Sequence, residues 1–114
     1  MFFPNQESRK SLAKKLNLRF DESMQDWEYE ISTPDRIDDF INEYKKSDTT
    51  DSEKESLIEI ILDSLNDLDE PSLKTFKNQL KITKEFLTKN KDLHSNTVDY
   101  WKESDFKIAR ILNL

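Results

Sequence analysis

The chain has 114 residues, 37% of them charged, with a formal net charge of −6 and neither cysteine nor glycine. The absence of cysteine excludes disulfides, thiol nucleophiles and thiolate metal sites, and the absence of glycine excludes P-loops and dinucleotide-binding fingerprints. The length and composition predict one folded domain covering residues 1–114 with a polar surface.

The first predicted helix covers residues 6–16, in which Leu12 and Leu16 are spaced four apart. Asn5 can cap its N-terminus, and Asn17 can adopt the left-handed conformation that commonly ends a helix.

No apolar run at the N-terminus resembles a signal peptide, and no segment approaches the roughly 20 apolar residues that cross a bilayer. We therefore expect a soluble, cytoplasmic protein.

Residues 20–32 fit two interpretations. Phe20, Met24, Trp27 and Ile31 follow helical spacing, whereas alternation of Trp27 and Ile31 with polar neighbours is typical of a half-buried strand. Because Asp21 can cap a helix and no strong partner strand is visible elsewhere, we favour the helix and leave the strand open.

The next two helices have clear start signals. Thr33, Pro34 and Asp35 combine an N-cap, a proline at the first helical position and an acid in the first turn. After a short loop, Thr50 and Glu53 form a capping box. The helix that follows has apolar residues on a wide stripe, which predicts the central core helix; these residues are Leu57, Ile58, Ile60, Ile61, Leu62, Leu65 and Leu68.

The remaining chain is also predicted to be helical. Pro71 opens a helix that Asn90 ends, another helix covers about 93–103, and Phe106–Leu114 forms a short last helix or an apolar strap. The sequence therefore predicts an all-α single-domain bundle of five to six helices with antiparallel packing.

The candidates for catalysis and metal binding are weak. His94 is the only histidine, and a lone histidine at a helix start, even beside Ser95, is more often a surface or capping residue than a catalytic base. The acids near residues 63–70 match no recognised ligand spacing. We therefore predict no enzyme, no catalytic residue, no metal and no cofactor.

A row of lysines at helical spacing follows Pro71. It comprises Lys74, Lys77, Lys81 and Lys84. Without an arginine-rich or aromatic platform this row is a weak signal for nucleic acid. We expect a solvated face, or a face turned toward the acidic helices of the same molecule, and neither nucleic acid nor membrane as a partner.

Charge is distributed unevenly along the chain. Residues 21–70 contain eighteen acidic and four basic side chains, a net of −14, whereas the segments before and after each sum to +4. Such asymmetry bears on partners and association rates. It predicts that a basic protein surface, rather than nucleic acid, binds the middle of the chain.

The acidic middle contains a regular row of like charges. Glu55, Glu59, Asp63 and Asp67 are spaced four apart, and the three like-charge pairs together destabilise an isolated helix by on the order of 1 kcal/mol. A cation from outside would relieve this repulsion. Upstream, acids alternate with Trp27 and Tyr29, a combination of aromatic anchors and charge that suits a protein interface. The predicted partner-binding residues are Asp26, Trp27, Glu28, Glu30, Asp35, Asp38, Asp39, Glu43, Glu55, Glu59, Asp63 and Asp67.

Residues 24–37, from Met24-Gln25-Asp26-Trp27 to Asp35-Arg36-Ile37, resemble small bacterial immunity proteins of contact-dependent growth inhibition and related polymorphic toxin systems. The similarity extends more loosely through residues 51–68, and reappears at Tyr100-Trp101 and Phe106-Lys107-Ile108. The resemblance implies a stoichiometric inhibitor of a cognate toxin, often the C-terminal nuclease domain of a large exported protein, bound in the cytoplasm. Among nucleases, a ribonuclease is favoured.

Two other functions fit the same residues. A non-catalytic helical adaptor would use the Phe106–Leu114 tail as a docking segment. A nucleic-acid mimic would need carboxylates spaced like phosphates on one continuous surface. The net charge of −14 over residues 21–70, together with the resemblance, favours the toxin inhibitor.

Overall fold

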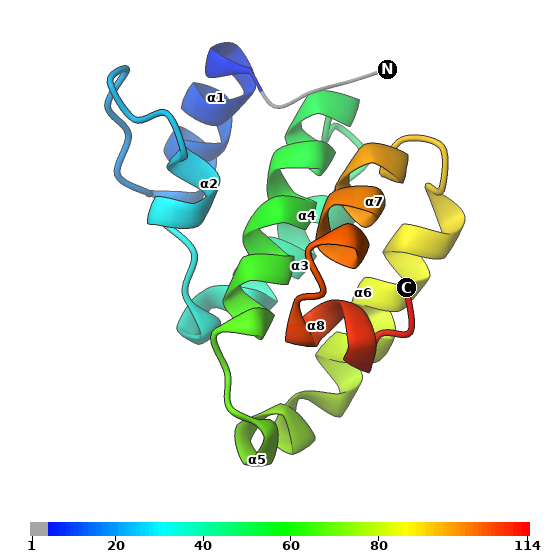
Figure 1. Ribbon diagram of the computed structural model, residues 1–114. Helices are drawn as coiled ribbons and strands as arrows, with labels where there is room; N and C mark the ends of the chain where they lie inside the picture. Colours follow the sequence, from blue (N-terminus) through cyan, green and yellow to red (C-terminus); the bar gives the residue numbers. More distant parts are fainter. Residues whose placement is uncertain (1–4) are drawn as a thin grey trace.

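Helix α4 (Asp51–Asn66) lies at the centre of the computed structural model, which describes residues 5–114 (Figure 1). Its apolar residues from Leu57 to Leu65 are fully buried. A helix that is apolar over most of its circumference must be covered on several sides. Helices α1, α2, α3 and α8 pack against it, which confirms the prediction of a central core helix.

The other elements surround α4. Before it in the chain come α1 (Gln6–Leu16), α2 (Trp27–Glu30), the 3-10 turn η1 (Pro34–Arg36) and α3 (Ile37–Lys45), and α3 lies behind α4 in Figure 1 and contacts both α4 and α6. After it come α5 (Glu70–Leu73), the 3-10 turn η2 (Lys74–Phe76), α6 (Lys77–Lys89), α7 (Ser95–Glu103) and α8 (Lys107–Ile111). In Figure 1, α1 and α2 lie to the left of α4, with α7, α8 and α6 to its right. Between residues 5 and 114 there is no strand, so the all-helical prediction is confirmed.

The predicted caps are confirmed. Asn5 Oδ1 accepts from Ser8 N at 2.8 Å, and the backbone of Asn17 is left-handed with φ 54°. Thr33 is the N-cap of η1, and Thr50 and Glu53 exchange both hydrogen bonds of a capping box at the start of α4. These short polar side chains satisfy backbone N–H groups that have no partner inside the helix.

Two helix boundaries differ from the prediction. The expected helix over 20–32 is reduced to the four residues of α2, because Asp21 accepts from Ser23 and closes a turn instead of capping a helix. The expected single helix after Pro71 is divided into α5, η2 and α6. At this break Thr75 Oγ1 donates to the carbonyl of Ser72, a local bond that competes with regular helix geometry.

The buried apolar side chains form one cluster, and the radius of gyration is 13.1 Å, near the value of about 13 Å expected for a compact chain of this size. The C-terminal tail belongs to this core, since Ile108 and Leu112 are buried. None of the helices in the described part of the chain has the length and apolarity to cross a bilayer.

Candidate partner-binding surface

The twelve predicted partner-binding residues divide into buried and exposed groups. Trp27, Glu28, Glu43 and Glu55 are at most 4% exposed. Glu59 and Asp63 are half-buried, and the exposed ones are Asp26, Glu30, Asp35, Asp38, Asp39 and Asp67. The four buried residues are therefore not presented to a partner, in contrast to the surface position expected for them.

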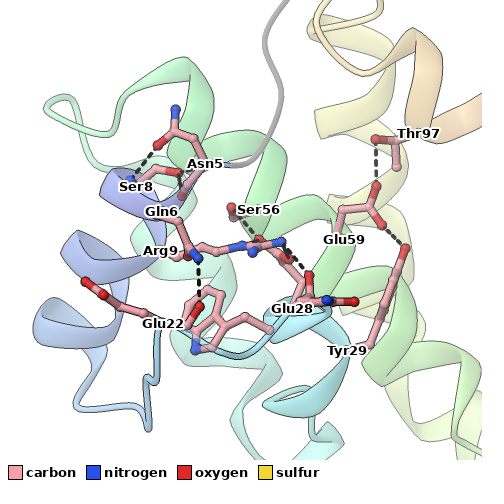
Figure 2. A network of polar contacts seen from close by, with 12 residues as sticks. Asn5, Gln6, Ser8, Arg9, Glu22, Glu28, Tyr29, Ser56, Glu59 and Thr97 are labelled. Atoms are coloured by element: carbon pink, nitrogen blue, oxygen red, sulfur yellow. Dashed lines mark hydrogen bonds and ion pairs between the residues drawn. The ribbon is translucent and has the colours of Figure 1, made fainter.

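Glu28 is held by an ion pair inside the protein. Arg9 of α1 donates to both of its carboxylate oxygens, at 2.8 and 2.7 Å, and Ser56 of α4 donates at 2.9 Å (Figure 2). A buried carboxylate is tolerated when charged and polar partners replace its water. Glu28 thus joins α1, α2 and α4.

Trp27 packs into the core next to this pair. Its indole N–H donates to the carbonyl of Arg19 at 2.6 Å, and its ring meets Phe20 edge to face with 6.3 Å between centroids. The same apolar area that makes tryptophan a frequent interface anchor also makes it a strong core residue. Here it fixes the 17–26 loop against α2.

The row of like charges on α4 finds its partners within the molecule. Glu59 accepts from Tyr29 and, at 3.0 Å, from Thr97, while Asp63 accepts from Ser32 (Figure 2 shows the Glu59 contacts). Burial is the largest influence on both acids and raises the pKa of Glu59 and of Asp63. Hydroxyl donors, rather than an outside cation, therefore contact these two acids of the row, and Asp67 alone is exposed.

Glu55, the first acid of the row, contacts His94. The histidine is fully buried, with Nδ1 against the Glu55 carboxylate and Nε2 2.6 Å from the Tyr44 hydroxyl, to which Asn90 also donates at 2.9 Å. The prediction of a surface histidine is wrong, because both ring nitrogens are engaged in the core; His94 does occupy the N-cap position of α7, but its side chain forms no cap hydrogen bond. Ser95 is directed elsewhere and donates to the Asp92 carbonyl.

Four exposed acids and the half-buried Asp63 lie on the end of α2, on η1, at the start of α3 and on the last turns of α4 or just after them. Ser32 donates to Asp63, and Thr33 N donates to Ser64 Oγ at 2.9 Å, so that η1 begins beside the last turns of α4 (Figure 1). We define the acidic end as Glu30, Asp35, Asp38, Asp63 and Asp67. Among the described residues, none of these five carboxylates forms an ion pair.

Two predicted acids lie apart from this group in their contacts. Asp39 pairs with Arg36 at 2.9 Å, and Asp26 precedes α2 without capping it through its side chain.

The sequence did not reveal the internal role of α1, whose Arg9 and Lys15 pair with the buried acids Glu28 and Glu53. The positive charge of the first twenty residues was its only signal.

Within residues 5–114, no group of three or more His, Cys, Asp or Glu side chains is arranged to hold a metal ion. Comparisons with known protein families, with curated proteins and with solved structures gave no match for this chain.

Proposed function

We propose that the protein is an immunity protein that binds a cognate basic toxin through the acidic end and neutralises it stoichiometrically. The proposal rests on the difference between the acids that have partners inside the molecule and the acids that have no ion pair. The buried acids have partners inside the molecule, whereas the acidic end has five carboxylates without ion pairs among the described residues, of which all but the half-buried Asp63 are exposed. Solvated, unpaired charge of one sign accelerates encounter with a surface of the opposite sign.

The kind of toxin follows from charge and from the resemblance of residues 24–37 to immunity proteins. A nuclease binds phosphates and therefore has a basic cleft, which complements the acidic end. A ribonuclease is favoured, and inhibition would take place in the cytoplasm, where such an enzyme meets its substrate. The inhibitor needs only to occupy or flank the cleft, so neither catalytic residue nor cofactor is required.

The two alternatives have less support. An adaptor that docks through its C-terminal tail needs a free tail, but Ile108 and Leu112 belong to the core. A nucleic-acid mimic needs a regular row of solvated carboxylates, but Glu55 is buried and Glu59 and Asp63 are half-buried in the row on α4.

The test is co-purification with the toxin domain encoded beside this protein, followed by measurement of Kd by calorimetry. The variant D35K/D38K/D67K reverses three charges of the acidic end and should weaken binding by at least about tenfold, because attraction to the basic cleft becomes repulsion. Thermal unfolding should show that the variant keeps its fold, since all three residues are exposed.

A matched control reverses three exposed acids elsewhere in the chain, E85K/D92K/E103K. It changes the net charge by the same amount and should leave Kd within about threefold. Equal losses in the two variants would show that net charge, rather than the acidic end, governs binding. Absence of any complex with the encoded neighbour would contradict the proposed function itself.

A further inference from the structure

The row of lysines along η2 and α6 has no role in the proposed toxin contact. Lys74, Lys77, Lys81 and Lys84 were expected to form a solvated face or to face the acidic helices. Among the described residues, none of the four forms an ion pair, and Lys84 Nζ instead donates to the Asn113 carbonyl at 3.2 Å, beyond the end of α8.

Two shallow hollows lie between the α5–α6 segment and the C-terminal segment, which are near each other in Figure 1, and the Lys84–Asn113 hydrogen bond belongs to the wall of one of them. The first has a volume of about 300 Å³ and the second about 370 Å³. Leu73, Lys77 and Leu80 line the first hollow, and Lys84, Leu87 and Lys91 line the second. Within α6 these residues are spaced three and four apart, so they share one face of that helix. We call this face and the opposing α8 segment the α6–α8 groove.

The α6–α8 groove has an apolar floor and a cationic rim. Ile111, 41% exposed, lies in its wall and is one of the two exposed large hydrophobic residues in the described part of the chain, the other being Tyr100. Four lysines line the groove against only two acids, Glu70 and Asp99. The groove therefore combines exposed apolar area with net positive charge.

We propose that the α6–α8 groove docks an acidic amphipathic helix of a partner protein. Such a helix would place its apolar side chains on Leu80, Leu87 and Ile111 and its carboxylates against the lysine rim. Charge complementarity selects an acidic partner over a basic one. Nucleic acid fits less well, because no aromatic side chain lines either hollow to stack on a base. The inference is independent of the toxin contact, which uses residues of α2, η1, α3 and α4.

The test uses a fluorescein-labelled helical peptide with leucines at i, i+3, i+4 and i+7 and glutamates at the other positions, and a twin peptide with lysines in place of the glutamates. Fluorescence anisotropy should show that the glutamate peptide binds the full chain and the lysine twin does not. The variants K77E/K91E and I111S should each weaken binding by at least about tenfold.

Two matched controls keep this test specific. K14E/K89E adds the same negative charge outside the groove, and Y100S removes the other exposed large hydrophobic side chain. Both should bind within about threefold of the unmodified chain. The proposal is overturned if the lysine twin binds as tightly, if the controls lose as much affinity, or if the protein sediments with phosphatidylglycerol vesicles but does not bind the glutamate peptide.

Discussion

Among single residues, Arg9 and Glu28 determine how α1 and α2 join the central helix. The side chain of Glu28 is 5% exposed and that of Arg9 15% exposed, so their ion pair is largely withdrawn from water. Ser56 supplies a further donor from α4. Removing one partner from such a pair is more damaging than removing both, because the remaining charge stays buried without compensation.

We therefore expect the substitution Arg9→Met to lower the free energy of unfolding by about 3 kcal/mol, because Glu28 then keeps only hydroxyl donors. The double variant R9M/E28Q should recover part of this loss, since glutamine carries no charge and can still accept from Ser56. Urea denaturation followed by circular dichroism measures both changes.

The neighbouring residue supplies the control for this prediction. Lys10 pairs with Glu22 on the surface, where both side chains are more than half exposed. Lys10→Met should therefore cost much less than Arg9→Met. Similar losses in the two single variants, or no recovery in R9M/E28Q, would mean that the buried ion pair does not hold α1 in place.

Residue patterns in the sequence identified the acids but not their surroundings. Trp27 and His94 show why. Tryptophan is common both in cores and at interfaces, and its position depends on Phe20 and the carbonyl of Arg19. His94 is buried because Glu55 and Tyr44, 39 and 50 residues away in the chain, occupy both of its ring nitrogens. Contacts at such separations leave no local signal.

At the scale of the helix, α4 carries two acids with opposite responses to pH. Burial raises the pKa of Glu59 above its ordinary value of 4.5. Burial would also raise the pKa of Glu53, but hydrogen bonds from Thr50, Lys15 and Ser11 outweigh it, and the pKa of Glu53 is lowered. Folding therefore strengthens proton binding at Glu59 and weakens it at Glu53.

We expect Glu59→Gln to become more favourable as pH rises. A carboxyl with a raised pKa contributes its full stability below pH 4.5, the ordinary value, and loses it as pH rises through the raised pKa. Glutamine keeps an oxygen for Tyr29 without acquiring charge. The free energy of unfolding of E59Q relative to the unmodified chain should therefore increase between about pH 4 and about pH 7, as urea denaturation at each pH measures.

Glu53→Gln should show the opposite trend on the same helix. A carboxyl with a lowered pKa contributes stability above pH 4.5 and loses it as pH falls through the lowered pKa. The loss of stability in E53Q should thus be largest near neutral pH and shrink in acid. Parallel pH trends in E59Q and E53Q would contradict the assigned environments.

The helices themselves were predictable where local signals agree. The caps at Asn5, Thr33 and Thr50, and the apolar width of α4, follow from residues within one or two turns. The prediction of a helix over residues 20–32 was wrong because the apolar residues of this segment can make their tertiary contacts from a loop as well as from a helix. The break between α5 and α6 rests on the Thr75–Ser72 hydrogen bond, which helical spacing alone does not reveal.

Across the whole molecule, folding divides the acids of residues 21–70 into those with partners inside the protein and those without an ion pair among the described residues. Arg9 and Lys15 of α1 pair with buried acids, and lysines of η2 and α6 line a different surface. The net charge of −6 therefore does not describe the field at the acidic end. A charge count along the sequence predicted an acidic partner-binding region, but only the fold distinguishes which acids remain free.

This distinction predicts the salt dependence of toxin association. The rate constant for association should fall steeply as ionic strength rises, because salt screens attraction between the acidic end and a basic cleft. The variants D35K/D38K/D67K and E85K/D92K/E103K both bring the net charge from −6 to zero, since each reversal adds two. Stopped-flow measurements from low to high salt should show that the first variant loses most of the salt dependence while the second retains it. If both lose it equally, the overall charge steers the encounter and the position of the acidic end has no part in it.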